Sequence, residues 1–400
     1  MANTLTPRDV YSLMNAIVSQ ATGQSNIAVV DTSTFVSVGE TLLRTAAENT
    51  LNAISTVLAD TIFSVRPYRG KLDSLRVTQR RWGAQVRKVV NLYDAAEASE
   101  DWNTDLNATQ LDDGNTVDMY TINKPKVMQL NFYGTAVLQK HITIFRDQLA
   151  LAFSSEEEFV RFIDSIMVEF NNEVELLNEN KTRLTLVNFI LGIHDMNLTE
   201  VDLVAEYNTD HSTSYTRAQL LTTYIEDFMK YVAAKIKIYS ELLTEMSANN
   251  HAQITGMSAI LRHTPKARQK MVMYNPVFIQ AESEVYSGLF NPQYLEIGDF
   301  EGVNFWQSQD APTTVTGTPN ILDTSTGQSA TGTANIGIDY VFGLLYDEEA
   351  LGVMPQFDYS STTPFNSAGG YYNNYVHWRF NSYNDFTENA VLFVLGAGGV

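Results

Sequence analysis

The charges of residues 66–118 are sorted by sign along the chain. Residues 66–88 carry eight cations and one acid, Asp73, whereas residues 94–118 carry eight acids and neither Lys nor Arg. Charges left on a protein's own surface are mostly solvated and add little stability. A segment that lies across another copy of the chain gains alignment and specificity from separated charges, because opposite potentials steer the contact. The pattern therefore favours a self-assembling structural protein.

This charged segment is the first part of a longer segment, residues 66–132, which is predicted to extend from the body of the protein and return to it. We call residues 66–132 the arm. Asp113 and Gly114 predict a tight hairpin turn at its tip, and alternating side chains at 127–132 predict the returning strand. A structureless loop of this length is unusual in a compact domain, so a functional projection is expected. The side chains expected to contact a neighbouring subunit are Arg66, Arg69, Lys71, Arg76, Arg80, Arg81, Arg87, Lys88, Asp94, Glu97, Asp112 and Asp113.

Composition narrows the class of protein further. With 400 residues, 44% of them hydrophobic, the chain can bury a large core in two or three lobes. A net charge of -20 argues against a surface that binds nucleic acid tightly. It is compatible with a protein that encloses nucleic acid without binding it tightly. There is no cysteine, which excludes disulfides and thiolate chemistry. No apolar run is long enough to span a membrane, and the amino terminus lacks a signal-peptide pattern, so a soluble protein made inside the cell is expected.

Helices dominate the first half of the sequence and strands the second. The strongest helix prediction is 155–191, where Ser155 and Glu158 form a capping box and apolar residues recur every three or four positions. Such a helix is about 55 Å long and suits a structural strut. Further helices are expected at 6–18, 39–60, 216–246 and 281–290. Strands are expected at 271–280 and from residue 340 onward, and the Thr-, Gly- and Ser-rich stretch 308–337 predicts a surface loop or hairpin.

A search for catalytic or metal-binding patterns finds none. The six histidines are scattered, and His194 beside Asp195 is better explained as a helix-terminal histidine than as a base with its orienting acid. Glu169, Glu173 and Glu179 are expected on the solvated face of the long helix, because no E-x-x-H pair accompanies them. The acidic residues near the arm's tip lack calcium-loop spacing. We therefore expect no enzymatic activity, no metal and no cofactor.

The carboxyl-terminal aromatic residues are the one group that invites a ligand. Tyr371, Tyr372, Tyr375 and Trp378 belong to a cluster that could stack on bases or sugars. Arg379 is the only basic residue placed among them, so packing in a core or interface is the role expected for them.

The order of these elements resembles that of tailed-bacteriophage major capsid proteins with the Hong Kong 97-like fold. The tail YYNNYVHWRF through NAV (371–380 and 389–391) looks like the closing strands of small podovirus capsid proteins. The stretch NPVFIQA (275–281) is similar to their axial-domain strand and the helix after it. The resemblance covers nearly the whole chain, and it depends on element order more than on any single motif.

This resemblance implies an α+β Hong Kong 97-like capsid fold with an N-terminal arm, an extended β-hairpin loop, a long spine helix, and peripheral and axial domains. The expected segments are 1–60 (N-terminal arm and helices), 61–135 (extended loop), 136–196 (peripheral domain with the spine helix), 197–339 (axial domain) and 340–400 (closing strands). No helical segment that could act as built-in scaffold is recognised, so a separate scaffolding protein or earlier cleavage is expected. No residue pair is assigned to a covalent cross-link.

The function that the resemblance implies is that of the major capsid protein of a tailed double-stranded DNA bacteriophage, made in the host bacterial cytoplasm and located in the virion. Copies would form the hexamers and pentamers of an icosahedral shell, with a scaffolding protein and a portal as partners, and with no membrane. The shell would enclose DNA without sequence-specific binding, and an acidic inner surface would let the DNA slide.

Three alternatives remain open from the sequence. An encapsulin-like compartment shell would share the fold and would carry a cargo-docking groove. An accessory virion protein could bind polysaccharide through the C-terminal aromatic residues. A hydrolase is the third alternative, and no acid–base pair supports it.

Overall fold

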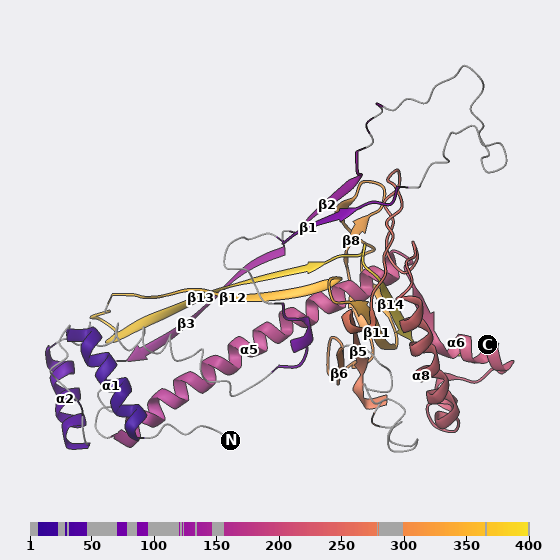
Figure 1. The fold of residues 1–400 in the computed structure, drawn as a ribbon. Helices are drawn as coiled ribbons and strands as arrows, with labels where there is room; N and C mark the ends of the chain where they lie inside the picture. The colour runs from indigo at the N-terminus through magenta and orange to yellow at the C-terminus, as the bar shows by residue number, and fades with distance from the viewer. Residues whose placement is uncertain are drawn as a thin grey trace. The chain divides into compact units, whose positions relative to one another are not determined.

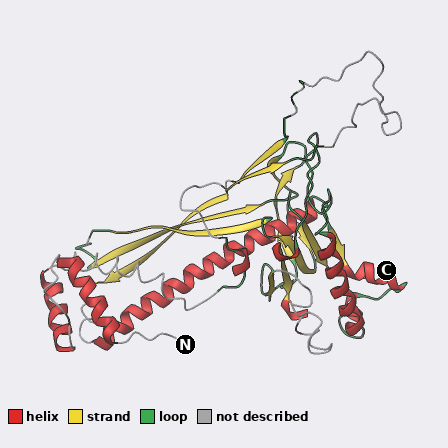
Figure 2. Ribbon diagram, viewed as in Figure 1, coloured by secondary structure: helices red, strands yellow, loops and turns green. Residues whose placement is uncertain are grey.

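The computed structural model shows a protein of mixed helix and sheet (Figures 1 and 2). It describes residues 7–22, 29, 32–45, 70–77, 86–94, 120, 122, 124–132, 134–145, 156–277, 279, 299–364 and 366–398. The chain divides into two compact units, which we describe separately. The first comprises Met1–Trp82, Gly134–Thr182 and Val353–Asn381, and the second comprises Gly83–Tyr133, Arg183–Gly352 and Ser382–Val400. This arrangement confirms the expected mixture of helix and sheet.

Helices α1 (Pro7–Thr22) and α2 (Thr32–Thr45) open the first unit. Met14, Ile17 and Val18 form the buried face of α1, at the spacing of three and four that an amphipathic helix requires. The Asn15 side chain accepts a hydrogen bond from the Val29 amide at 2.7 Å, which fixes the connection between the helices. Helix α2 begins seven residues before the predicted start at residue 39, and positions 46–60 lie outside the described residues.

A three-stranded sheet and the first part of a long helix make up most of the rest of the first unit, and the helix residues from Arg183 onward belong to the second unit. The sheet has the order β12-β13-β3, formed by β12 (Leu351–Thr362), β13 (Tyr371–Asn384) and β3 (Gly134–Phe145). Helix α5 (Glu156–Asp195) runs alongside this sheet (Figure 1). An ion pair between Lys140 of β3 and Glu173 of α5 joins the two.

Helix α5 confirms the strongest helix prediction, because it extends from one residue after the predicted start to four residues past the predicted end. It ends where Asn197 takes a positive φ of 50° and the Leu198 amide donates to the Ile193 carbonyl at 3.0 Å. One prediction on this helix is wrong: Glu179 is 6% exposed and is not part of a solvated face. The Gly70 amide donates to Glu175 at 2.9 Å, and Glu179 lies beside Gly70, so the segment 70–77 covers this side of the helix. The local sequence of the helix does not show this long-range contact.

A five-stranded mixed sheet forms the core of the second unit. Its order is β4-β14-β11-β5-β6, with β4 (Glu200–Asp202), β14 (Ala390–Val394), β11 (Val341–Asp347), β5 (Gln269–Tyr274) and β6 (Asp299–Val303). Every residue of β11 and β14 is buried. The continuous apolar sequence of β14 predicts this. Both neighbours of β11 run antiparallel to it, whereas β4 and β6 pair in parallel at the two edges.

The helix predicted at 216–246 is divided into two. Its described helices are α7 (Arg217–Leu220) and α8 (Ile225–Leu242), which follow α6 (Leu203–His211). Thr216 caps α7 and forms a capping box with Gln219. The residues between α7 and α8 include Thr222 and Thr223, whose side chains lower helix propensity and explain the break.

The stretch predicted as a loop or hairpin is a hairpin in two steps. Strands β7 (Val315–Gly317) and β10 (Ile336–Ile338) pair at its base, and β8 (Asn320–Asp323) and β9 (Gln328–Thr331) pair beyond them. The Asp323 carboxylate accepts hydrogen bonds from Ser325 and Thr326, and Gly327 takes a φ of 68°. These contacts close the turn. Two 3₁₀ turns, η1 (Asp73–Leu75) and η2 (Lys266–Arg268), complete the described elements.

Replacing Gly192 of α5 by Ala tests the packing of the long helix in the second unit. Alanine normally stabilises a helix by about 1 kcal/mol relative to glycine. Here a Cβ at position 192 would meet the Phe386 ring, so Gly192→Ala is expected to lower the free energy of unfolding by about 1 to 3 kcal/mol in urea titrations. Asn180→Ala, at an exposed position of the same helix, is the control and is expected to cause no loss of stability.

Candidate functional site

The described root of the arm is an antiparallel ribbon of β1 (Val86–Asn91) and β2 (Val127–Phe132), which we call the root ribbon. Side chains alternate between its faces. The inner face carries Val90 opposite Met128, and both are buried. The outer face carries Val89 and Val127, which are 57% and 60% exposed. One face of the root ribbon is therefore packed and the other is open.

Apolar packing holds the inner face. Val90 and Met128 form a buried cluster with Ile254 and Ile260, and three partly buried leucines surround it. These are Leu92, Leu130 and Leu322. Burying one such side chain is worth about 1.5 to 3 kcal/mol. The cluster is thus the main apolar attachment of the root ribbon to the second unit.

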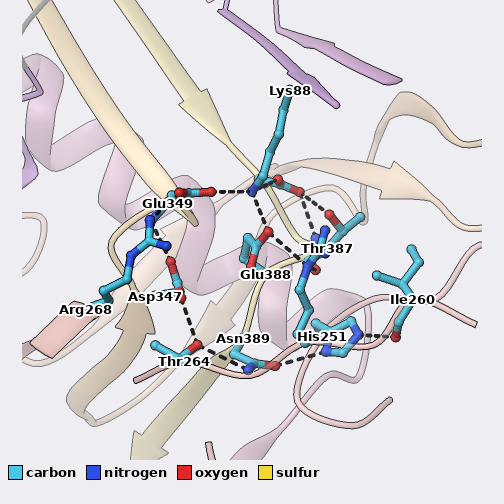
Figure 3. A network of polar contacts seen from close by, with 12 residues as sticks. Lys88, His251, Ile260, Thr264, Arg268, Asp347, Glu349, Thr387, Glu388 and Asn389 are labelled. Atoms are coloured by element: carbon cyan, nitrogen blue, oxygen red, sulfur yellow. Dashed lines mark hydrogen bonds and ion pairs between the residues drawn. The ribbon is translucent and has the colours of Figure 1, made fainter. Parts of the chain in front are cut away.

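Lys88 of β1 extends from the root ribbon into a group of carboxylates (Figure 3). Its Nζ lies 2.5 Å from Glu388 Oε1, 2.9 Å from Asp385 Oδ2 and 3.4 Å from Glu349 Oε2. The Lys88 side chain is 17% exposed and that of Asp385 only 1% exposed. A charge this far from water requires partners, and Lys88 and the acids supply them to each other.

The two buried carboxylates are held in place by groups other than Lys88. Asp385 Oδ1 accepts hydrogen bonds from the Thr387 amide at 2.9 Å and from the Thr387 hydroxyl at 2.6 Å. Arg262 Nε lies 2.9 Å from Glu388 Oε1. Thr387 and Arg262 therefore orient the carboxylate oxygens that Lys88 binds.

A chain of polar contacts connects this site to the apolar cluster (Figure 3). Thr264 donates to Asp347 at 2.8 Å and accepts from Asn389 at 3.2 Å. His251 Nδ1 lies 3.0 Å from the Asn389 side-chain oxygen, and its Nε2 lies 2.9 Å from the Ile260 carbonyl oxygen. Ile260 also packs under the root ribbon. The polar contacts and the apolar cluster therefore fix the same segment of chain around Ile260.

The pKa shifts show how burial and charge compete in this site. Burial alone would lower the pKa of Lys88, but Asp385 and Glu388 outweigh it and raise the pKa. Burial raises the pKa of Glu388, against the effect of Lys88 and Arg262. Burial acts in the same direction on Glu349, but its partners Arg268 and Lys88 lower the pKa overall. Lys88 is therefore firmly charged at neutral pH and is the cation on which the buried acids depend.

The structure places the predicted contact residues in different settings. Arg76 pairs with Glu175 of α5 at 2.6 Å, within the first unit. Lys71 is half-buried in the same segment. Asp94 pairs with Lys126 at 2.9 Å across the root of the arm, and both side chains are more than half exposed. Arg87 and Lys88 are in the root ribbon. The other predicted contact residues lie outside the described part of the chain: Arg66, Arg69, Arg80, Arg81, Glu97, Asp112 and Asp113.

Arg76 and Lys88 thus take acidic partners from their own chain, where the sequence suggested partners on a neighbour. Arg87 differs, because it lies on the outer face of the root ribbon, is exposed, and makes no ion pair with the described residues. Sequence reasoning missed Asp385 and Glu388. The only available signal was two acids in a short turn between a strand rich in aromatic residues and a fully apolar strand.

Other candidate chemistry finds no support in the described residues. His194 lies at the end of α5, 2.5 Å from Glu200, as a helix-terminal histidine. No group of acidic or histidine side chains there could hold a metal ion. Trp378 and Tyr372 are 4% and 3% exposed, so they are packed inside and cannot offer a sugar-binding surface.

None of the described helices has the length and apolar character needed to cross a membrane.

Comparison with known proteins gives a family and a fold. Residues 14–394 match the family described as Phi29-like phage major capsid protein. A solved chain in the capsid structure of Staphylococcus phage Andhra is similar, with a TM-score of 0.52 and 8% identity, over 83% of this chain and 86% of that one. A chain in the structure of the head fibre and inner core protein gp22 of native bacteriophage P68 gives a TM-score of 0.51 and 10% identity, over 82% and 86%. No curated protein sequence matches.

Removing the Lys88 ammonium tests the polar attachment of the root ribbon. Lys88→Met leaves Asp385 and Glu388 buried with less compensation, so we expect the free energy of unfolding to fall by about 3 kcal/mol. Lys126→Met, on the other strand of the ribbon, removes only the exposed pair with Asp94 and is expected to cost less than about 1 kcal/mol. Urea unfolding of the unassembled subunits measures both, and equal losses would contradict the assignment.

Proposed function

The chain belongs to the Phi29-like phage major capsid protein family, and from this we propose that its copies form an icosahedral shell with the Hong Kong 97-like fold around double-stranded DNA. The family makes it a structural protein of the virion that assembles with copies of itself. The arrangement into hexamers and pentamers, the scaffolding protein, the portal and the enclosed DNA are parts of the proposal. So is production in the host bacterial cytoplasm.

The observation that carries this proposal is the division of the root ribbon into a packed and an open face. On the open face Val89 and Val127 are more than half exposed. Tyr120 and Ile122, just before β2, are 82% and 80% exposed. Large apolar side chains that are exposed to this degree are typical of a protein interface. A neighbouring subunit that covers the arm would bury them.

We assign the charged residues of the arm to this interface in two groups. Arg87 is exposed on the open face and is available to an acid of a neighbour. The side chains outside the described residues, from Arg66 to Asp113, keep the contact role that the sorted charges predict. Lys88 and Arg76 act differently, since they hold the root of the arm and the segment 70–77 to their own units. The arm is then attached at its root and reaches a neighbour beyond it.

The segments that the sequence predicts are part of the proposal. Helix α5 takes the role of the spine helix in the expected peripheral segment, 136–196. The extended loop is 61–135, and the N-terminal arm is 1–60. The axial domain is 197–339, which holds α6 and α8 and the two-step hairpin. The closing strands are 340–400, which hold β11 to β14. An encapsulin-like shell would share this plan, but the family match favours the phage capsid.

Substitutions on the open face test whether the arm contacts a neighbour. Val89→Glu places a charge where an apolar contact is proposed, so assembly into shells is expected to fall at least about tenfold, the effect of about 1.4 kcal/mol per contact. Val89→Thr keeps the β-branched shape and is expected to assemble nearly normally. Sedimentation and negative-stain microscopy measure shell yield, and circular dichroism confirms that both variants fold. Normal shells from Val89→Glu would remove the open face from the interface.

A further inference from the structure

Strand β2 forms an unprotected edge of the root ribbon. It pairs with β1 on one side, and no other described strand pairs with it on the opposite side (Figure 1). The peptide groups along a free edge can pair with another chain, and proteins usually prevent this with charged side chains, proline or a covering segment. The β2 sequence, VMQLNF, contains no charged residue and no proline. Two of the usual protections are therefore missing from this strand.

The register of the ribbon shows which peptide groups of β2 point outward. The Leu92 amide donates to the Lys126 carbonyl at 2.9 Å, in the same register as the rest of the ribbon. Hydrogen-bonded and non-hydrogen-bonded positions alternate along an antiparallel pair. Val127, Gln129 and Asn131 therefore occupy non-hydrogen-bonded positions, and their N–H and C=O groups point away from β1.

These outward groups are free to bind another strand. None of them forms a backbone hydrogen bond with a described residue beyond the ribbon. The side chains of Val127, Gln129 and Asn131 are exposed as well, and the Gln129 amide donates to the Asn131 side-chain oxygen at 3.0 Å. Each of the three residues offers one donor and one acceptor to a partner. The edge of β2 is thus an uncharged ladder of hydrogen-bonding groups in contact with solvent.

Other edge strands of the second unit carry charges that oppose such pairing. Strands β4 and β6, at the two edges of the five-stranded sheet, contain two acids each. Strand β1, the other edge of the root ribbon, contains Arg87 and Lys88. Its edge is also occupied at one end, where the Tyr93 amide donates to the Ala259 carbonyl at 3.2 Å. Because like charges oppose the pairing of identical chains, β2 is the edge of the ribbon better suited to it.

We propose that β2 pairs through its free edge with an extended segment of a second copy of this chain. The inference deepens the proposed function and rests on it, because it names the kind of contact that the root of the arm makes in the shell. A second copy is the occupant because proteins of this family assemble with copies of themselves. Chains with a net charge of -20 also approach each other most easily where charge is absent.

Strand addition explains why the open face and the free edge occur on the same strand. Hydrogen bonds between backbones supply part of the affinity in this mode of binding, and alternate side chains supply the rest. Val127 is 60% exposed beside the edge and would pack against a side chain of the added strand. Backbone pairing also fixes the register between subunits, as a regular shell requires.

A proline at position 129 tests the pairing. The Gln129 amide points out of the ribbon, so Gln129→Pro removes an outward donor while the hydrogen bonds between β1 and β2 remain. Gln129→Thr is the matched control, because it changes the same side chain and keeps the amide. Shell yield, measured by sedimentation and negative-stain microscopy, is expected to fall at least about tenfold for Gln129→Pro and to stay nearly unchanged for Gln129→Thr. Urea unfolding of the unassembled subunits is expected to show that both variants fold.

Hydrogen exchange in the wild-type protein provides a second measurement that needs no substitution. The amides of Val127, Gln129 and Asn131 are expected to exchange at least about tenfold more slowly in shells than in unassembled subunits. The amides of Met128 and Leu130 are bonded within the ribbon and are expected to be protected in both states. This alternation is the signature of an added strand, because burial of a face alone would not select every second amide.

The other outcomes overturn the inference. If Gln129→Pro forms shells as the wild type does, or if the three outward amides exchange equally fast in shells and subunits, β2 does not pair with a second copy. If Gln129→Thr loses shells as severely as Gln129→Pro, the side chain makes the contact and the backbone does not. Should the proline variant fail to fold, the exchange pattern of the wild type decides. A wild type that forms no shells at all would instead contradict the proposed function.

Discussion

The ion pairs between Lys88 and the carboxylates of Asp385 and Glu388 are the interaction on which the arm depends. They join a strand near residue 88 to a turn about 300 residues later, and the acids are almost fully buried. Burying charges costs free energy, and well-packed apolar side chains in their place often give equal or greater stability. These ion pairs therefore contribute more to the orientation of the ribbon than to its stability. Lys88 binds carboxylate oxygens whose positions Thr387 and Arg262 already fix.

That geometry suits a protein whose copies must all present the same arm in the same direction. The apolar cluster of Val90, Met128, Ile254 and Ile260 attaches the root ribbon, but apolar contact is not directional. A slip of the ribbon by one residue would turn Lys88 away from its acids and move Val89 inward. The ion pairs therefore select one register, and the cluster supplies most of the free energy. Together they make the open face of the ribbon a defined surface in every subunit.

Local patterns in the sequence predicted the elements well and their long-range partners poorly. The long helix, the hairpin in the Thr-rich stretch and the fully buried strand after Asn389 follow from periodicity and turn chemistry, and the structure confirms them. The sorted charges of the arm predicted contacts with a neighbouring subunit, whereas Lys88 and Arg76 have acidic partners within the chain. Asp385 and Glu388 share one short turn and Glu175 lies on a long helix, and none of these local sequences identifies a distant cation as the partner. Only folding brings them to their cations, so no pattern in one segment could reveal them.

The distribution of charge over the chain has a further physical consequence. A net charge of -20 keeps separate subunits apart in solution and opposes their association, so assembly has to concentrate favourable contacts at a few places. The root ribbon offers one of these, with exposed valines beside Arg87. An otherwise repulsive surface restricts contacts between subunits to such places, because approaches elsewhere bring like charges together.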